Sequence, residues 1–583
     1  MADADTRALT RIAVIGAGAS GLAQIAQLKE IYGRDAVAAE TRVEIVGFEA
    51  RDGVGGIWWV VSWDELTSRN YDPNPSPFLH ATRVVDGKTQ LLPHPRGAEA
   101  PTPVYDGLRT NLAGGIMQYR GFPFPDTAHL FPTSAQVLAY LQSYAEARGL
   151  LEHIRFNTRV ERLRLTPSAG ARRGGRRWGI TSSNTVAGTT AHEEFDYVAV
   201  ANGHYADGYI PPIEGLSGFP GTVQHSREFR READYAGRTV LVVGSFASGS
   251  DVSRLIAQLN VGHYAADGAP LHAGAGEKLP FTKVYQSSSG VPNINNGLQD
   301  GTEAWKPFVV NVPLIERVEG ASAEYPKGRV HFYEAGAETE NGPATASHAP
   351  LDDVDVIIFA TGYYYALPFI KAADAPWDAL RPLEDEIARD ERAGGAEWET
   401  GGLRGWAVRG LDPLLLFLEN DRTIVFNVLQ YQIAPFPFAE VQARLAALLW
   451  AGLLPNFPDV PTPPPNLGNP YIAQQLALPA SGAPTPALSD AAHSRASSPP
   501  STPPEGHEQP RVVEGKGEPL RHTHRKRKEF IFPNPYEVYW TEYVFSLTRE
   551  GEDEGTEDYW LAFEQWRADL RNDVFLRKRT LGY

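Results

Sequence analysis

The stretch that decides the fold is Arg11-Ile12-Ala13-Val14-Ile15-Gly16-Ala17-Gly18-Ala19-Ser20-Gly21, close to the start of the chain. Its β-branched run predicts a strand, its three glycines in GxGxxG spacing predict a tight turn, and apolar residues three apart over 22–31 predict a helix. A second strand is predicted over 42–48, and Glu49 follows it, 28 positions after Gly21. That interval is longer than the usual one of about 20 but permits a βαβ unit. The opening therefore predicts a dinucleotide site.

Each residue type in this turn has a physical reason in such a site. Gly16 permits the bend, Gly18 lets backbone amides approach a pyrophosphate, and Gly21 lets the helix pack closely on the strand. The N-terminus of the helix then faces the phosphates, and Glu49 binds the ribose hydroxyls. Because an acidic ribose ligand repels a 2′-phosphate, the site should hold FAD or NAD rather than NADP.

The same order of elements returns in the middle of the chain. Residues 238–243 predict a strand, Gly244-Ser245-Phe246-Ala247-Ser248-Gly249 predicts a turn, and 251–259 predicts a helix. Phe246 stands where the middle glycine would be, so a pyrophosphate should be pushed away or approach differently. We expect nicotinamide-nucleotide binding here, with a purely structural βαβ crossover as the alternative. Further strands are predicted over 281–286 and 355–359.

The composition excludes several classes of protein. The 583 residues include 54 Lys and Arg against 71 Asp and Glu, a net charge of −17, which repels nucleic acid. The absence of cysteine excludes thiolate nucleophiles, redox disulfides and Cys-ligated metals, and the 15 scattered histidines suggest no metal cluster. The longest apolar run, 445–454, is too short to span a membrane, and the N-terminus lacks a signal peptide's apolar core. We therefore expect a cytoplasmic protein.

The composition changes after residue 460. Thirteen of the 50 residues over 461–510 are proline, and such a segment buries too little apolar surface to offset its chain entropy. We predict a disordered, proline-rich linker over 456–529. The stretch 530–583 regains aromatic residues and is predicted to dock on the body.

A signature in the middle of the chain points to a known family. Phe219, Gly221, His225 and Phe229 match the fixed positions of FxGxxxHxxx(Y/F), and with this motif the chain resembles the FMO type of class B flavin-containing monooxygenases. Four further matches follow in family order: Gly55-Gly56-Ile57-Trp58, Thr110-Asn111, Phe122-Pro123-Phe124-Pro125 and Phe359-Ala360-Thr361-Gly362-Tyr363 with Pro368. A weaker echo lies at Glu440, Gln442 and Ala443.

The resemblance implies an α/β fold with two Rossmann-like, doubly wound dinucleotide-binding domains. The NADPH domain is inserted in the FAD domain. The expected ranges are 10–210 and 350–455 for the two parts of the FAD domain, and 211–349 for the NAD(P)H domain.

The activity implied is that of an FAD- and NADPH-dependent monooxygenase, similar to N,N-dimethylaniline monooxygenase. A C4a-hydroperoxyflavin would oxygenate a nitrogen or sulfur of a small soft nucleophile with O2. Asn111 matches the family's active-site Asn, whose amide can donate to the flavin adduct. The cofactor-binding residues implied are Gly16, Gly18, Ser20, Gly21, Glu49, Gly56, Trp58, Thr110, Asn111, Val160, Gly244, Ser248, Gly249, Thr361 and Gly362. Whether the protein forms a homodimer is left open by the sequence.

Two departures from the family pattern bear on this reading. Ala113-Gly114-Gly115 stands where the family shows Pro and a basic residue, so the loop after Asn111 should be more mobile and leak peroxide. Ser289 stands where relatives present an Arg to the 2′-phosphate of NADPH, which leaves the preference between NADPH and NADH open. His225 lies at the expected join of the two domains, where a structural role is favoured over proton transfer.

Two other functions are alternatives. A Baeyer–Villiger monooxygenase acting on ketones would carry Trp where this chain has Phe229. A non-oxygenating flavin NAD(P)H oxidase or redox sensor is favoured by Phe246, Ala113 and Ser289. A disulfide reductase is excluded because the chain has no cysteine.

Overall fold

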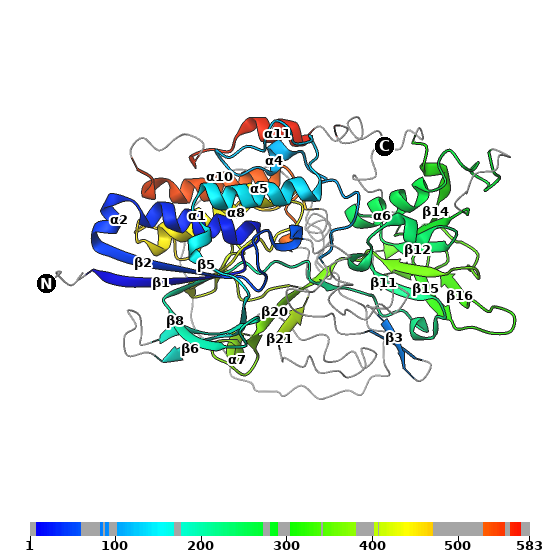
Figure 1. Ribbon diagram of the computed structural model, residues 1–583, viewed down its shortest axis with the longest axis horizontal. Coiled ribbons are helices and arrows are strands. Elements are labelled where there is room, and N and C mark those ends of the chain that lie inside the picture. Colours follow the sequence, from blue (N-terminus) through cyan, green and yellow to red (C-terminus); the bar gives the residue numbers. More distant parts are fainter. Residues whose placement is uncertain are drawn as a thin grey trace, which may run out of the picture.

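The computed structural model of the chain contains two main sheets of mostly parallel strands, which lie side by side along the long axis (Figure 1). It describes residues 7–59, 82–85, 88–91, 102–167, 176–271, 280–289, 303–339, 342–344, 346–380, 402–405, 407–469, 529–553, 560–572 and 576. Most of the predicted proline-rich linker, residues 470–528, lies outside these ranges. None of the described helices combines the length and apolarity that a membrane crossing needs.

The first sheet has six strands. In spatial order they are β22 (Phe417–Leu418), β23 (Asp421–Phe426), β9 (Tyr197–Val200), β1 (Ala8–Ile15), β2 (Thr41–Phe48) and β5 (Ile154–Arg155). Strand β1 pairs in parallel with both β2 and β9. It is buried on both faces, which explains its continuous apolar run instead of an alternating one.

Different layers cover the two faces of this sheet. Ile12 and Val14 pack into the core formed with the helices α1 (Ala19–Tyr32), α5 (Ser134–Ala147) and α8 (Pro435–Trp450). Ala13 and Ile15 pack into the core on the other side, where β6 (Thr158–Pro167), β7 (Arg176–Asn184) and β8 (Thr190–Phe195) form a small antiparallel sheet. Figure 1 shows the helices above the six-stranded sheet and β6 and β8 below it.

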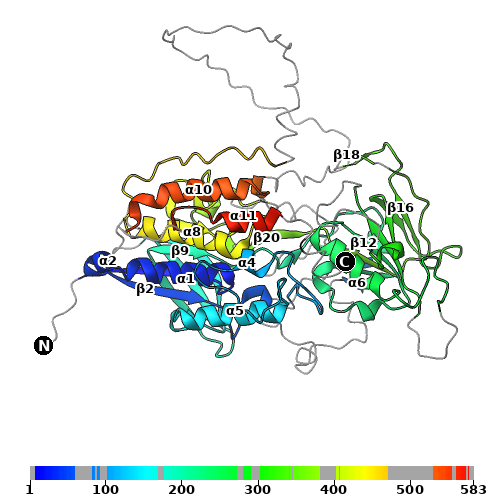
Figure 2. The same ribbon diagram turned by 90° about the horizontal axis from the view of Figure 1, so that it is seen from above.

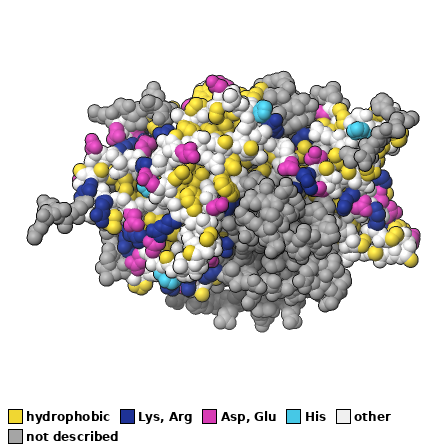
Figure 3. Space-filling model, in the orientation of Figure 1, with side chains coloured by type: hydrophobic (Ala, Val, Ile, Leu, Met, Phe, Trp, Pro, Cys, Tyr) yellow, Lys and Arg dark blue, Asp and Glu magenta, His cyan; other side chains and the backbone are white. Residues whose placement is uncertain are grey.

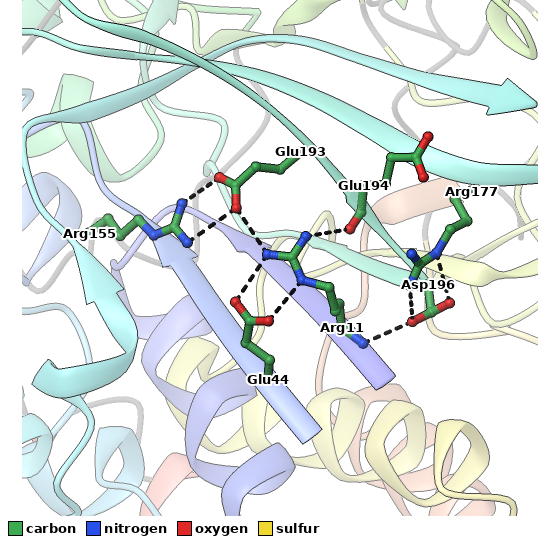
Figure 4. Close-up of polar contacts among 7 residues, drawn as sticks. All are labelled: Arg11, Glu44, Arg155, Arg177, Glu193, Glu194 and Asp196. Atoms are coloured by element: carbon green, nitrogen blue, oxygen red, sulfur yellow. Dashed lines mark hydrogen bonds and ion pairs between the residues drawn. The ribbon is translucent and has the colours of Figure 1, made fainter. Parts of the chain in front are cut away.

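Charged side chains tie the small sheet to the first one (Figure 4). The Arg11 guanidinium donates to Glu44 on β2 at 2.9 Å and to Glu193 on β8 at 2.9 Å, and its backbone amide donates to Asp196 at 2.9 Å. Arg155 also pairs with Glu193. Figure 3 shows Lys, Arg, Asp and Glu side chains gathered at the left of the molecule, over the same sheets. Charge pairing therefore joins three separate strands.

The second sheet has five parallel strands. In spatial order they are β11 (Thr222–His225), β19 (Val356–Phe359), β12 (Thr239–Val243), β13 (Lys283–Ser287) and β14 (Val309–Val312). Helix α6 (Ala247–Gln258) packs on it. The hairpin of β15 (Ile315–Glu319) and β16 (Arg329–Phe332) packs on the opposite side. Both helices after the glycine turns begin earlier than predicted, at Ala19 and Ala247, because the last glycine of each turn already lies in the first helical turn.

The chain enters the second sheet after β9 and returns to the first at β22 and β23. Strand β10 (Asp207–Gly208) on the way out pairs with β20 (Tyr363–Lys371) on the way back, and β20 also pairs with β21 (Gly402–Gly405). One nucleotide-binding unit is thus inserted in the other, which confirms the predicted fold class. Strand β19 belongs to the second sheet although it falls in the range 350–455 assigned to the FAD domain, and the domain boundaries stay a prediction.

The C-terminal segment packs on the helical layer of the first sheet. Helix α10 (Tyr536–Thr548) lies along α8, and α11 (Gln565–Asn572) lies over α4 (Gly114–Met117) (Figure 2). The remaining elements are short: α2 (Asp35–Glu40), α7 (Trp377–Leu380), β3 (Thr82–Val85), β4 (Lys88–Leu91), β17 (Glu338–Thr339) and β18 (Gly342–Pro343).

Candidate functional site

The first glycine turn is required by the packing of the chain itself. Gly16 has a φ of +101°, a left-handed conformation that favours glycine, and its amide donates to the Phe48 carbonyl at 2.8 Å. A Cβ on Gly16 would lie 2.6 Å from the Ala201 oxygen. A Cβ on Gly21 would lie 1.9 Å from the Gly16 oxygen. A side chain at Gly21 would push α1 away from the end of β1, and one at Gly16 would push the turn away from Ala201, which follows β9.

A second glycine-rich turn packs on the first. The Gly55 amide donates to the Ala17 oxygen at 3.1 Å, and a Cβ on Gly56 would lie 2.9 Å from the Gly18 Cα. The two turns therefore meet backbone to backbone. Trp58 ends the short 3-10 helix that starts at Gly56, and its half-buried ring packs on the core of the helical layer.

The N-terminus of α1 has no side-chain cap on its first amides. No side chain caps α1 at Gly18, whereas the Thr133 hydroxyl and the Gln136 side chain cap α5 through a capping box. The first turn of a helix has amides without partners inside the helix, and these amides bind anions. Ser20, in this turn, is partly exposed. The uncapped turn therefore fits the pyrophosphate of a dinucleotide.

Glu49 lies at the end of β2, beside this turn. It is 8% exposed, and one carboxylate oxygen accepts from the Ala17 amide at 2.8 Å while the other accepts from the Arg51 amide at 3.0 Å. Arg51 in turn donates to the Gly56 oxygen at 2.5 Å, and burial lowers its pKa although the Glu49 charge opposes the shift. A carboxylate held by two amides keeps lone pairs for further donors, so Glu49 fits ribose hydroxyls.

The second turn repeats the first in detail. Gly244 has a φ of +107°, its amide donates to the Ser287 oxygen at 2.8 Å, and its Cβ would lie 2.6 Å from the Ala360 oxygen. A Cβ on Gly249 would lie 2.0 Å from the Gly244 oxygen. Helix α6 likewise has no side-chain cap, and Ser248 is exposed in its first turn. Residues 244–249 therefore have the local geometry of a nucleotide turn.

Two positions distinguish the second turn from the first. Phe246 takes the place of Gly18 with φ −78° and ψ −166° against −75° and −171°, and its side chain is 51% exposed. Ser288 follows the last residue of β13 as Glu49 follows the last residue of β2. The strand end therefore carries a neutral residue in the second site, where a 2′-phosphate meets no carboxylate from this position.

The crossing between the two units carries three predicted residues. His225 ends β11 and is buried, with its Nε2 on the Gly362 oxygen at 2.9 Å and its Nδ1 accepting from the Arg227 amide at 3.1 Å. Thr361 donates its hydroxyl hydrogen to the Tyr209 oxygen. Both nitrogens of His225 thus face the backbone of the crossing, which agrees with a structural role.

Thr110 and Asn111 lie in a loop before α4. Thr110 is buried, and its hydroxyl donates to the Leu112 oxygen at 2.7 Å. The Asn111 side chain is exposed, and among the described residues it has no hydrogen-bonding partner. The loop reaches the first turn through Tyr119, whose hydroxyl donates to the Ala19 oxygen at 2.7 Å. Val160, also predicted as a cofactor residue, directs its buried side chain into the core below the first sheet.

A buried carboxyl group backs this loop. Glu440 on α8 accepts from the Arg120 amide at 2.7 Å, and burial raises its pKa to about 8. Tyr140 donates to the Phe122 oxygen and accepts from the Tyr119 amide, both at 2.7 Å. The sequence showed Glu440 only as a weak family echo, and nothing in it indicated Arg51 or Tyr119, because their partners are backbone groups.

Comparison with known proteins agrees with this geometry. A family model described as flavin-binding monooxygenase-like matches residues 92–263. Two Arabidopsis thaliana relatives are the flavin-containing monooxygenases FMO GS-OX5 and FMO GS-OX1. The first is 29% identical over 380 residues, 64% of this chain and 64% of that protein. The second is 32% identical over 303 residues, 51% of this chain and 56% of that protein. The matched region thus spans less than two thirds of either relative.

A solved structure shares the fold over nearly the whole chain. The S-allyl-L-cysteine S-oxygenase of Allium sativum superposes with a TM-score of 0.56 at 20% identity. The superposition covers 98% of this chain and 93% of that one. At this identity the likeness concerns the fold, and it includes the second unit inserted in the first.

Proposed function

Because the chain belongs to the flavin-containing monooxygenase family, we propose that it is an FAD- and NADPH-dependent monooxygenase acting on a nitrogen or sulfur of a small soft nucleophile. The observation that carries this proposal is the pair of matching glycine turns, one followed by Glu49 and the other by Ser288. Two nucleotide sites of different charge in one chain suit two different dinucleotides.

The first turn would hold FAD. The uncapped amides of α1 bind its pyrophosphate, and Glu49 accepts from its ribose hydroxyls. Gly18 and Gly56 keep side chains away from this path. Bound FAD supplies the redox step, because it accepts a hydride from NADPH and activates O2.

The second turn would hold NADPH. The uncapped amides of α6 would face the pyrophosphate, and the ring of Phe246, 51% exposed, lies at the N-cap beside them. Ser288 leaves room for a 2′-phosphate. Lys283 begins β13, at the end of the strand opposite Ser288, and is already paired with Asp353 at 2.6 Å.

Asn111 would donate a hydrogen bond to the oxygen on which negative charge develops. Its exposed amide is a neutral donor that needs no proton transfer, and the aromatic layer of Tyr119, Tyr140 and Phe124 lies behind its loop. An amide donor in a site closed to water stabilises developing negative charge on oxygen. Closure matters because water at the flavin diverts O2 to hydrogen peroxide.

The substrate class follows from two observations. Phe229, in place of the Trp of Baeyer–Villiger enzymes, is fully buried between Tyr105 and Tyr235, with ring centroids 5.3 and 5.4 Å away. The Allium sativum structure is that of an S-oxygenase, which supports sulfur as an acceptor. We therefore favour amines and sulfides over ketones.

The test is anaerobic reduction of the FAD-loaded protein by NADPH and by NADH, followed by turnover in oxygenated buffer. Amines, thiols, sulfides and ketones are each supplied, and NADPH consumption, oxygenated product and hydrogen peroxide are measured. We expect faster reduction by NADPH and product formed from a sulfide or an amine. Stoichiometric peroxide with every substrate would instead indicate an oxidase, and esters from ketones would indicate a Baeyer–Villiger enzyme.

A further inference from the structure

We infer that α11 completes the candidate site and that Arg567 is the residue that positions the loop carrying Asn111. The inference rests on the proposed function for the role of Asn111, but the contact itself does not depend on it. Its basis is the set of hydrogen bonds and packing contacts that the C-terminal segment makes with residues 113–120.

Arg567 caps the short helix that follows Asn111. Its Nη1 donates to three backbone oxygens, those of Gly115 at 3.1 Å, Ile116 at 3.0 Å and Gln118 at 2.9 Å. The last carbonyls of a helix have no partner inside the helix, and a cation there is favourable. Arg567 is 3% exposed, and Glu564 holds its Nε at 2.5 Å. The buried guanidinium of Arg567 therefore hydrogen-bonds most of the backbone oxygens at the C-terminal end of α4.

Residues 113–115 have little side chain with which to pack. Ala113-Gly114-Gly115 offers only a methyl group, and glycine has the largest backbone freedom to lose on folding. A Cβ on Gly115 would lie 3.4 Å from the Trp566 ring and 3.6 Å from Leu570, so α11 lies directly against it. The sequence predicted a mobile loop here, and α11 supplies the packing that the loop lacks.

A second contact holds the end of the same stretch. The Arg120 guanidinium lies 4.8 Å from the Phe545 ring centroid and 5.5 Å from that of Trp560, and it donates to the Ala562 oxygen at 3.4 Å. The backbone amide of Arg120 donates to Glu440 on α8. Residues 113–120 are thus fixed between α8 and the C-terminal segment.

The C-terminal segment has its own attachment to the body. The Trp540 ring of α10 stacks on Phe438 of α8 at 4.6 Å between centroids, and Glu537 accepts from the Ala434 amide at 2.7 Å. Arg571 pairs with Glu537. A change at Arg567 alone therefore leaves α10 in place and tests the contact with α4.

The experiment compares Arg567→Ala and Arg567→Lys with the wild-type chain. Asp569→Asn, an exposed change on the same helix, is the control. Amide hydrogen exchange of residues 111–118 is measured without cofactor, and hydrogen peroxide per NADPH oxidised is measured on the loaded enzyme. The rate of anaerobic flavin reduction and the thermal midpoint are measured as well.

We expect Arg567→Ala to raise exchange over 111–118 about tenfold and to raise the peroxide yield severalfold. Flavin reduction should stay within about twofold, because the hydride step does not use this loop. Arg567→Lys should be intermediate, since an ammonium reaches fewer of the three oxygens, and Asp569→Asn should match wild type.

Unchanged exchange in Arg567→Ala, or equal effects in Asp569→Asn, would overturn the inference. A change in exchange without any change in peroxide yield would show a purely structural contact and would also overturn it. If the wild-type enzyme itself released all oxygen as peroxide, the proposed function would fail, while the exchange data would still decide whether Arg567 holds the loop.

Discussion

Gly18 and Phe246 adopt nearly the same backbone conformation in two copies of one turn, yet only one of them carries a side chain. The packing of the protein explains Gly16, Gly21, Gly244 and Gly249, whose Cβ atoms would collide with backbone oxygens. It does not demand glycine at position 18, where a Cβ would meet only Gly56 at 3.4 Å. The proposed ligand, approaching the backbone closely, would explain a glycine at position 18.

We predict that Phe246→Gly tightens NADPH binding. The residue lies at the N-cap of α6 with negative φ, where glycine is accepted at little cost. Removing the ring opens the amides of α6 to the pyrophosphate, and we expect the Kd for NADPH to fall about three- to tenfold. The measurement is titration of the FAD-loaded enzyme with NADP⁺ and NADPH. Phe246→Leu is the control, and weaker binding in Phe246→Gly would mean that the ring contacts the nucleotide.

A single residue, Glu440, also makes the free energy of unfolding depend on pH, because its carboxyl group is buried. Burial raises its pKa to about 8 from the ordinary 4.5. A raised folded-state pKa gives a contribution to stability that is complete below pH 4.5 and is lost as the pH rises through 8. The carboxyl group therefore favours the folded state most when it is protonated.

We predict that Glu440→Gln stabilises the protein at pH 8 but not at pH 4.5. The amide oxygen can still accept from the Arg120 amide, and the variant avoids a cost of about 4 kcal/mol at pH 8. Urea unfolding at both pH values checks this, with the exposed Glu419→Gln as control. The same free-energy difference at both pH values would contradict the assignment.

At the scale of elements, ion pairs add to the backbone pairing of β1 with β2 and connect these two strands to β8. The cost of partly burying the Arg11 charge is offset because its guanidinium donates to Glu44 and Glu193. The guanidinium also lies 4.6 Å from the centroid of the Phe195 ring. The Arg11 hydrogen bond lowers the pKa of Glu44. The pKa of Glu193 is also lowered, since bonds from Arg155 and Arg11 together outweigh its burial.

We predict that Arg11→Gln lowers the free energy of unfolding by about 1–2 kcal/mol at pH 7. Because the folded-state pKa values of Glu44 and Glu193 lie below 4.5, this stabilisation is present above pH 4.5 and is lost as the pH falls through the folded values. Urea unfolding at pH 7 and near pH 3.5 measures the difference. An effect that persists undiminished in acid would point to lost packing instead of lost charge pairing.

For the whole molecule, the first sheet is the centre of assembly. The N-terminal strand, the strands after the inserted unit and the C-terminal helices all pack on it or on its helical layer. The Arg444 guanidinium of α8 illustrates this, since it pairs with Glu30 of α1 at 2.7 Å and with Glu552 after α10 at 2.6 Å. Segments more than 500 residues apart in sequence thus share one layer.

We predict that FAD stabilises the entire chain, whereas NADP⁺ added without FAD stabilises it little. FAD would bind at the end of β1, and a ligand that binds only the folded state raises stability by about 3 kcal/mol at 100 times its Kd. Thermal unfolding with and without each cofactor measures the shift in Tm. A larger shift from NADP⁺ than from FAD would reverse the assignment of the two turns.

Local sequence determined a large part of this protein. The glycine spacing at 16–21 and at 244–249, the β-branched strands before each turn and Glu49 after β2 predicted two nucleotide-binding units. The family resemblance added that one unit is inserted in the other, and the fold confirms both. These features are readable because strand, turn and helix are set by neighbours within a few residues.

Only the tertiary structure decided the rest. Tyr119 and Arg567 donate to backbone oxygens of residues far away in the sequence, and a backbone oxygen is the same for every residue type, so the sequence does not indicate it. The covering of Ala113-Gly114-Gly115 by α11 is such a case, because the loop and the helix are separated by some 450 residues. Contacts across that distance depend on how the layers pack, and so the sequence alone could not show that α11 covers the loop that it predicted to be mobile.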